Sequence, residues 1–379
     1  MQGWATNRTW SCDREGRSMQ VLGSKAQGAR LERMKASPRF KDGMFHNTSL
    51  VTQGLKKGTA VSTMKEFICG GQRRVPTGVL PIVNPLEQWL LPVQGGLRAT
   101  WLGHSTVLLE VDGKRVLTDP VWGERISPLP FTGPKRFHPA PVTIGQLPPL
   151  HAVVISHDHY DHLDYPTILQ LIPLGVPFVT SLGVGAHLEA WGVPPERITE
   201  LDWWESAEVG GLTFTAAPSQ HFSGRSVADR NRTAWSSIVV RGPHHAVFFS
   251  GDTGLTQEYV EIRQRLGPFD LIMLEVGAWD PAWGDIHLGP ENALQAHDLL
   301  GGGAFLPVHW GTFNLAIHSW DEPAETLVKL APTNAPLIMP RLGQPIEPLQ
   351  VQSIDPWWRE VDQTETEPAP AEAVTEPSD

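Results

Sequence analysis

The stretch Ile155-Ser-His-Asp-His-Tyr-Asp-His-Leu-Asp164 decides the fold of this chain. The stretch begins at the last residue of Ala152-Val-Val-Ile155, a short, apolar and β-branched run that predicts a buried strand. The loop after that strand holds four side chains that can bind a metal: His157, His159, Asp161 and His162. In a protein core, each of these would need its own hydrogen-bond partner. Their density therefore favours metal binding over core packing.

The spacing within this loop indicates two metal positions rather than one. Side chains of an extended chain repeat every two residues, so His157 and His159 face the same side. The chain is expected to turn into a helix near Tyr165-Pro166, which lets Asp161 and His162 face a second point nearby.

Three more candidate ligands each follow an apolar, strand-like run: His221, Asp252 and His309. Each alone is weak, because an Asp in a turn is more often a cap than a ligand. Together with the loop they make five His and two Asp, a set that suits two adjacent divalent metals. Ligation by nitrogen and oxygen without thiolate fits two Zn²⁺, and Mn²⁺ or Fe would also accept it.

Short strands alternate with helices over residues 98–345. Strands are predicted at 99–102, 106–111, 115–118, 152–155, 177–180, 197–201, 212–216, 236–240, 246–250, 270–274 and 304–308. Asp112-Gly113 predicts a tight hairpin turn, and helices are predicted near 183–191, 256–266, 290–300 and 322–330. We therefore expect an α/β fold, an αββα sandwich of two mixed sheets flanked by helices.

The flanking segments differ in composition from this domain. Residues 1–37 are polar and without periodicity, which predicts a disordered leader. Residues 38–97 have short apolar pieces broken by Gly and Pro, and we expect an extended segment that wraps the domain. Residues 346–379 are expected to form an acidic, Pro- and Glu-rich tail, disordered from about residue 360.

Charge is unevenly distributed along the chain, whose net charge is −11. Residues 1–74 carry 14 Lys and Arg against 5 Asp and Glu, whereas the remainder carries 16 against 36. An acidic body argues against nucleic acid as a partner. The basic N-terminal region favours either a solvated leader or peripheral contact with an anionic membrane, at about 1 kcal/mol per well-placed basic residue.

Neither a transmembrane segment nor a signal peptide is evident, and the two cysteines imply no disulfide framework. We therefore expect a cytoplasmic protein, with contact at the membrane surface left open.

The motifs together resemble a known family. The loop His-x-His-x-Asp-His, followed by isolated His, Asp and His, is similar to the metallo-β-lactamase superfamily. More narrowly, Trp101-Leu-Gly-His-Ser-Thr-Val, Ser156-His-Asp-His-Tyr-Asp-His-Leu-Asp-Tyr165, Gly251-Asp-Thr-Gly254 and His309-Trp-Gly-Thr-Phe313 resemble the N-acylphosphatidylethanolamine-hydrolysing phospholipase D family and its bacterial relatives. This similarity runs from about residue 37 to about residue 342.

The resemblance implies a role for each candidate ligand. One zinc would be held by His157, His159 and His221, and the other by Asp161, His162 and His309. Asp252 would bridge the two. Asp119, at the end of a predicted strand, would contact the histidines of the loop from behind and fix their orientation.

The resemblance also implies a reaction. We expect a zinc-dependent phosphodiesterase of phospholipase D type, acting on an N-acyl phosphatidylethanolamine or similar amphiphile through a hydroxide that bridges the two metals. Asp161 is expected at the catalytic centre. His287, in a Gly- and Trp-rich loop, is the candidate for assisting the leaving group, against the alternative of an exposed loop residue.

Candidate substrate contacts are Tyr160, His104, Trp279 and Trp283. Tyr160 either orients substrate or packs, and His104 either supports a ligand or contacts substrate. Gly224 and Ile286 stand where animal members of the family carry Lys and Gln, so the lipid is not fixed by the motifs. A carbonyl hydrolase such as a lactonase or esterase, and a non-catalytic metal-binding scaffold, remain as alternatives.

Overall fold

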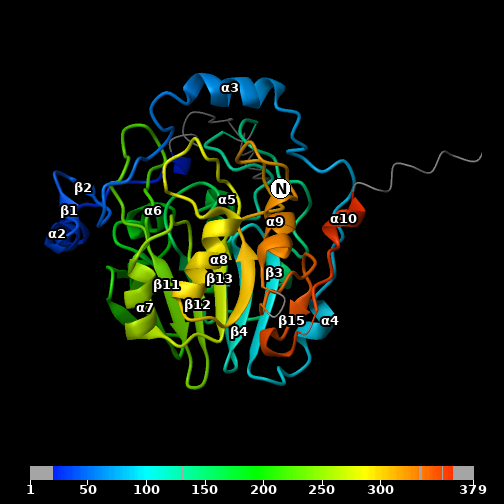
Figure 1. The fold of residues 1–379 in the computed structure, drawn as a ribbon. Coiled ribbons are helices and arrows are strands. Elements are labelled where there is room, and N and C mark those ends of the chain that lie inside the picture. The colour runs from blue at the N-terminus through cyan, green and yellow to red at the C-terminus, as the bar shows by residue number, and fades with distance from the viewer. Residues whose placement is uncertain (1–19, 130, 333–334, 352, 362–379) are drawn as a thin grey trace, which may run out of the picture.

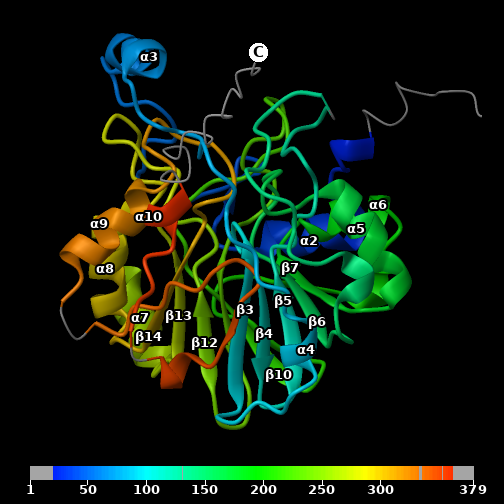
Figure 2. The ribbon, with the colours of Figure 1, turned by 90° about the vertical axis from the view of Figure 1, so that its right-hand side faces the viewer.

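Two β-sheets pack face to face with helices on both outer sides, which gives four layers (Figures 1 and 2). The computed structural model describes residues 20–129, 131–332, 335–351 and 353–361. In Figure 2, α8 and α9 cover one sheet and α5 and α6 cover the other. The predicted αββα sandwich is therefore confirmed.

One sheet has seven strands and the other has six. In spatial order, the seven-stranded sheet contains β15 (Pro345–Ile346), β3 (Leu97–Gly103), β4 (Thr106–Val111), β5 (Lys114–Thr118), β6 (Ala152–Ile155), β7 (Phe178–Ser181) and β8 (Ile198–Leu201). The six-stranded sheet contains β14 (Ala304–Val308), β13 (Leu271–Glu275), β12 (Ala246–Phe249), β11 (Ser237–Arg241), β10 (Leu212–Ala217) and β9 (Ser206–Val209). A separate small hairpin pairs β1 (Phe40–Lys41) with β2 (Met44–Phe45).

Helices alternate with these strands along the chain. They are α2 (Gly28–Ala36), α3 (Ala60–Cys69), α4 (Leu86–Trp89), α5 (Tyr165–Leu171), α6 (Gly185–Ala190), α7 (Glu258–Leu266), α8 (Gly289–Leu299), α9 (Glu322–Leu330) and α10 (Trp358–Val361). Short 3₁₀ turns occupy Ile144–Gln146, Ile172–Leu174, Pro195–Arg197 and Pro348–Gln350. None of the helices in the described ranges is both long and apolar enough to cross a bilayer.

The continuous apolar strands are explained by burial on both faces. In β4, Val107 and Leu109 enter the core between the sheets, whereas Leu108 packs beneath the outer helices. In β6, Val154 points to the first of these cores and Val153 to the second. Because successive side chains of a strand point to opposite faces, a strand in the middle of four layers is apolar at most positions on both faces.

Strand direction determines where the candidate ligands collect. In the first sheet β5 and β6 are parallel, and β3 runs the same way because β3 and β5 are both antiparallel to β4. In the second sheet β12, β13 and β14 are parallel, and β10 runs with them because β10 and β12 are both antiparallel to β11. The loops that follow these strands therefore emerge at a common end of each sheet.

Most predicted elements are confirmed, including the tight hairpin between β4 and β5. Asp112 and Gly113 form its two-residue turn with φ of 48° and 79°, values that favour Asp and Gly. Two strands of the two sheets were not predicted. Strand β9 is polar and half-exposed at a sheet edge, and β15 has only two residues, so neither has an apolar signature.

The disorder predicted for residues 1–37 is wrong from Gln20 onward, and residues 1–19 lie outside the described ranges. Helix α2 packs Met34 against Leu182 and Trp235, and its Arg30 forms ion pairs with Glu189 and Glu200. The basic side chains of this segment thus meet acidic partners on the domain, a pairing that composition alone does not reveal.

Part of the predicted acidic tail is also folded onto the domain. Trp357 and Trp358 are buried, and the Trp357 ring lies 5.7 Å from that of Trp310. Residues 362–379, which include most of the stretch predicted to be disordered, lie outside the described residues.

Candidate metal centre

The loops that leave the two sheets bring all seven candidate ligands together. His157, His159, His221 and Asp252 form one group, in which ligand-capable atoms lie within 4.8 Å of one another. Asp161, His162 and His309 form a second group, joined by His104. The seven candidate ligands come from the loops after β6, β10, β12 and β14, as their positions at strand ends predicted, and His104 follows β3.

The carboxylate of Asp252 lies between the two groups and turns one oxygen toward each. Its Oδ1 is 3.1 Å from His162 Nε2 and 3.2 Å from His309 Nε2. Its Oδ2 is 3.9 Å from His157 Nε2 and 3.7 Å from His221 Nε2. This is the arrangement that a carboxylate shared by two cations requires.

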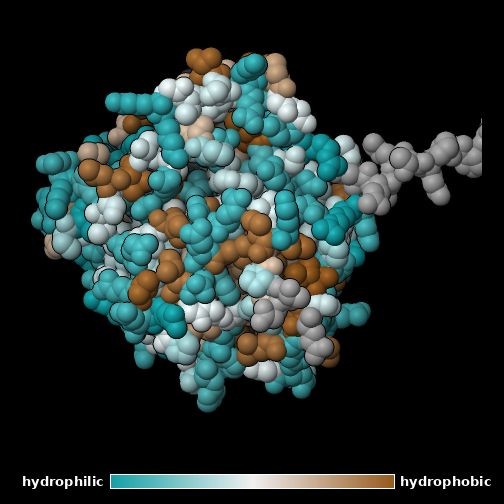
Figure 3. Space-filling view, in the orientation of Figure 1, coloured by the Kyte–Doolittle hydropathy of each residue, from teal (hydrophilic) through white to brown (hydrophobic). Residues whose placement is uncertain are grey.

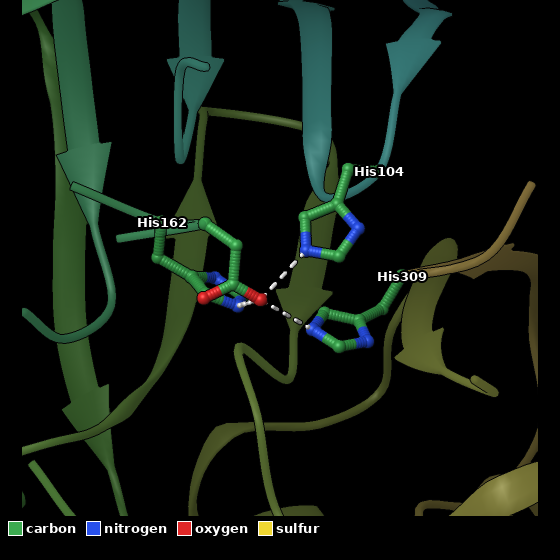
Figure 4. Close-up of side chains that lie close together, drawn as sticks. His104, His162 and His309 are labelled. Carbon is green, nitrogen blue, oxygen red and sulfur yellow. Dashed lines mark hydrogen bonds and ion pairs between the residues drawn. The ribbon is translucent and has the colours of Figure 1, made fainter. Parts of the chain in front are cut away.

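Within each group, ligand atoms face one another. His159 Nδ1 is 2.9 Å from His157 Nε2 and 3.2 Å from His221 Nε2. In the second group, Figure 4 shows His104, His162 and His309 directed at one carboxylate. The Oδ2 atom of Asp161 lies 3.0, 3.5 and 3.3 Å from their Nε2 atoms, respectively.

Several of these buried atoms lack a hydrogen bond. His162 Nε2, His309 Nε2 and Asp252 Oδ1 lie within ion-pair distance, yet none of them makes a hydrogen bond of acceptable geometry. A buried polar atom without a partner costs about 1–3 kcal/mol. A cation placed among these atoms would satisfy all three, so the residues present fit a metal.

The histidines of the cluster differ in the direction of their pKa shifts. Burial lowers the pKa of His157 and His221 well below the ordinary value for histidine, so both rings are neutral and ready to act as ligands. Burial also opposes charge on His309, but the carboxylates of Asp252 and Asp161 raise its pKa to about 10. A bound metal would therefore displace a proton from this ring.

The outer nitrogens of the rings are held by the protein. Asp119, buried after β5, accepts hydrogen bonds from His162 Nδ1 at 2.6 Å, from the Ser156 hydroxyl at 2.6 Å and from the Ser156 N–H at 2.7 Å. The ring of His221 donates through Nδ1 to the Ile286 carbonyl at 2.8 Å. These bonds fix which nitrogen of each ring faces the metal position. The predicted contact between Asp119 and the loop is confirmed.

Replacing Asp119 with Ala is expected to weaken metal binding about 10- to 100-fold, because His162 loses its orienting partner. Competition between the protein and a chromogenic chelator for zinc measures this effect. Asp298→Ala, on the outer helix α8, is the control and should leave affinity unchanged. An Asp119→Ala protein of unchanged affinity would contradict this role.

Strained backbone marks three of these positions. His104, Asp119 and His309 have φ of 51°, 31° and 64°, in the left-handed region that favours glycine. Each residue directly follows a strand. The sharp turn aims the side chain back across the end of the sheet, and the strain is retained where function requires that direction.

His287 lies beside this centre and is held by a residue that sequence reasoning missed. Its Nδ1 is 2.8 Å from Glu275 Oε2, at the end of β13, and 3.9 Å from Asp252 Oδ2. Glu275 is fully buried and also accepts a hydrogen bond from the Thr253 N–H at 2.7 Å. A carboxylate at the end of the apolar run Leu-Ile-Met-Leu was the available signal.

A cavity of about 380 Å³ opens over the centre. Ligand residues His159, Asp161, Asp252 and His309 line it, together with His287 and apolar residues that include Leu55, Phe222, Trp283, Ile286 and Leu315. A second, mainly apolar cavity of about 670 Å³ shares Leu55, Trp283 and Leu315 with the first and extends to α3. The metal centre thus borders a long apolar surface.

Of the four candidate substrate contacts, Trp283 alone lines these two cavities. Tyr160 packs instead, because its hydroxyl donates to the Arg225 carbonyl at 2.7 Å. His104 is buried behind Asp161, and Trp279 stacks on His318 with ring centres 4.3 Å apart. The prediction that these three residues contact substrate does not agree with their positions.

Comparison with known proteins places this geometry in a family. Residues 114–310 match the beta-lactamase superfamily domain. An uncharacterised protein of Mycobacterium tuberculosis is 45% identical over 331 residues, which cover 85% of this chain and 88% of that protein. N-acyl-phosphatidylethanolamine-hydrolyzing phospholipase D 1 of Caenorhabditis elegans is 37% identical over 250 residues, which cover 62% and 70% of the two chains.

Solved structures agree with the fold. The isothiocyanate hydrolase from Delia radicum gut bacteria superposes with a TM-score of 0.54 at 23% identity, covering 66% of this chain and 98% of that one. A possible metal-dependent hydrolase of Veillonella parvula also superposes with a TM-score of 0.54, at 18% identity. The match covers 66% of this chain and 98% of that one. With two sheets, a His-x-His-x-Asp-His loop and buried His and Asp clusters in place, the chain belongs to the metallo-β-lactamase superfamily.

Proposed function

We propose that this protein is a dinuclear zinc hydrolase that cleaves the phosphodiester of an N-acyl phosphatidylethanolamine or a similar amphiphile, in the manner of a phospholipase D. The observation that carries the proposal is the position of Asp252, whose two oxygens face two separate groups of ligands. Ligands of nitrogen and oxygen without thiolate suit zinc, and Mn²⁺ or iron is the alternative.

The apolar surroundings support an amphiphilic substrate. A phosphodiester placed at the centre would have Trp283 and Leu315 beside it, and an acyl chain could continue into the larger cavity below Met64 and Phe67 of α3. The similarity to the Caenorhabditis elegans phospholipase D supports the same substrate class. At position 286 the cavity wall is an Ile, which offers apolar contact and no hydrogen bond.

Hydrolysis at phosphorus forms one bond to a water oxygen and breaks the bond to the ethanolamine oxygen. When bound, two divalent cations lower the pKa of water and withdraw charge from the phosphoryl oxygens. His157, His159, His221, Asp161, His162, His309 and Asp252 would hold them. The departing ethanolamine oxygen must gain a proton. Because Nδ1 of His287 donates to Glu275, Nε2 carries a proton only when the ring is doubly protonated. Burial opposes that charge, but the Glu275 carboxylate raises the pKa of His287, and the imidazolium could then give its Nε2 proton into the cavity and be left neutral.

The decisive test combines elemental analysis with a substrate panel. We expect about two zinc ions per chain, and phosphatidic acid and an N-acylethanolamine as products from an N-acyl phosphatidylethanolamine. Cleavage of acyl lactones or esters without cleavage of the phospholipid would favour the carbonyl hydrolase. Bound metal without hydrolysis of either panel would favour the scaffold, and a protein without metal would overturn the proposal.

We also propose that α3 contacts the membrane surface from which such a substrate comes. None of its residues is buried, and Val61 and Ile68 are 83% and 72% exposed. The helix lies at the top of the molecule, where Figure 3 shows hydrophobic side chains. Lys56, Lys57 and Lys65 on or next to it add charge that suits anionic lipids.

Val61→Glu with Ile68→Glu is expected to weaken binding to anionic vesicles at least about tenfold, since each buried apolar side chain contributes roughly 1.5–3 kcal/mol. Neither residue lines the larger cavity, so turnover of a dispersed short-chain substrate should not change. Sedimentation with vesicles measures the binding. Leu349→Glu, which changes an exposed residue near β15, is the control. Equal loss in both proteins would contradict a specific role for α3.

A further inference from the structure

The N-terminal segment reaches two of the four loops that carry the candidate metal ligands, the loops after β6 and β10. Residues 20–47 lie before residues 114–310, the part of the chain that matches the superfamily domain. They are nevertheless fastened to it, because Phe45 is fully buried and its N–H donates to the Asn231 carbonyl at 2.7 Å. The Trp191 indole also donates to the Gln20 carbonyl, at 2.6 Å.

Asn47, at the end of this segment, binds the backbone of a candidate ligand at two points. Its Nδ2 donates to the His221 carbonyl at 2.8 Å, and its Oδ1 accepts from the His221 N–H at 3.1 Å. The same Oδ1 accepts from the indole of Trp235 at 3.1 Å, which fixes the orientation of the amide. A side-chain amide therefore completes the backbone hydrogen bonds of His221, as a neighbouring strand would.

Arg225 connects the start of the segment to the loop after β6. Its Nη1 donates to the carbonyls of Asp158 and Leu163 at 2.7 and 2.8 Å. These two carbonyls bracket His159, Asp161 and His162. On its other side, the guanidinium donates through Nε and Nη2 to the Val21 carbonyl at 3.1 and 3.0 Å.

The geometry around Arg225 leaves it little freedom. The side chain is 3% exposed, and its guanidinium carbon lies 4.1 Å from the centre of the Tyr160 ring and 5.1 Å from that of Trp191. A planar group with five donors suits a site where three carbonyls must be joined, and a lysine could not do the same.

We infer that residues 20–47 form a clamp on the ligand-bearing loops after β6 and β10, with Asn47 of the segment and Arg225, which binds the segment at Val21, as positioning residues that set metal affinity. The inference rests on the proposed metal centre. Asn47 acts on His221 and hence on the group that contains His157 and His159. Arg225 acts on the loop that serves both groups. The two residues are therefore expected to have different effects on two bound metals.

Zinc titration in competition with a chromogenic chelator tests the clamp on the full chain. Asn47→Ala is expected to weaken one of two zinc equivalents about tenfold and to spare the other, whereas Arg225→Lys should weaken both. Asn47→Asp keeps the acceptor oxygen and loses the donor, so an intermediate effect is expected. Asn84→Ala is the matched control, because the Asn84 amide accepts a local hydrogen bond from the Leu86 N–H.

Thermal unfolding of the metal-free proteins separates positioning from simple stability. A lower melting temperature in Asn47→Ala and Asn47→Asp with unchanged affinity for both zinc ions would overturn the clamp. A wild-type protein that binds no zinc would overturn the metal centre itself, and the clamp with it. Normal two-zinc binding by the wild type and by both Asn47 variants would overturn the clamp alone.

Discussion

Asp252→Asn is expected to bind at most one zinc ion per chain and to hydrolyse substrate at least about 1,000-fold more slowly than the wild type. The substitution keeps the volume of the side chain. It removes the negative charge and replaces one carboxylate oxygen with an NH₂ group, which cannot bind a cation. Each oxygen of Asp252 faces a different group of histidines. Losing the bridge therefore affects both metal positions at once.

Elemental analysis and initial rates check this expectation side by side. Asp285→Asn is the matched control, because the Asp285 side chain is 78% exposed and lies 3.8 Å from the exposed Lys56. An exposed ion pair of this kind contributes little. Circular dichroism should show the same fold in both variants. Two zinc ions and normal turnover in Asp252→Asn would show that Asp252 is not a bridging ligand.

The ligand set could be predicted because its signal is local in the sequence. Four of the seven residues lie within one loop, and each of the others comes within a few residues of the end of an apolar strand. Parallel strands bring their carboxyl ends to one edge of a sheet, so residues at strand ends become neighbours even when they lie far apart in the sequence, as His162 and His309 do. Spacing and strand direction together are sufficient for this part of the site.

The supporting residues could not be predicted, because their signal is not local. Asn47 and Arg225 are single polar residues in segments without periodicity, and their partners are backbone atoms that any sequence supplies. Order in residues 20–37 depends on acidic partners such as Glu200, far along the chain. From composition alone this segment was predicted to be a solvated leader, because the ion pairs with residues such as Glu200 become apparent only once the fold is known.

Burial also decides the roles of aromatic and histidine residues that the motifs left open. Tyr160 lies within the ligand loop, yet Arg225 holds its hydroxyl and covers its ring. His104 is 2% exposed and contacts Asp161, so it supports a ligand instead of lining the cavity. Trp283 differs from Trp279 by four positions but lies in both cavities. Side-chain direction within a loop is set by tertiary packing.

His287→Ala is expected to lower kcat about 100-fold while zinc content stays at two per chain. The expectation follows from the different surroundings of the two ring nitrogens of His287. Glu275 holds Nδ1 at 2.8 Å, and the ring lines the cavity over the metal centre. This ring is the best-placed group outside the ligand set to give a proton to the departing oxygen, and removing it should leave KM nearly unchanged.

The metal measurement decides between two roles for this histidine. Asp252, Glu275, His287 and His309 also lie close enough to form a ligand group of their own. If His287 were a ligand, its removal would reduce zinc content as well as turnover. His297→Ala, in the last turn of α8 with its ring hydrogen-bonded to the Gly303 carbonyl, should change neither quantity. Full zinc content with a lowered kcat in His287→Ala alone therefore identifies proton transfer, and unchanged turnover would remove His287 from the reaction.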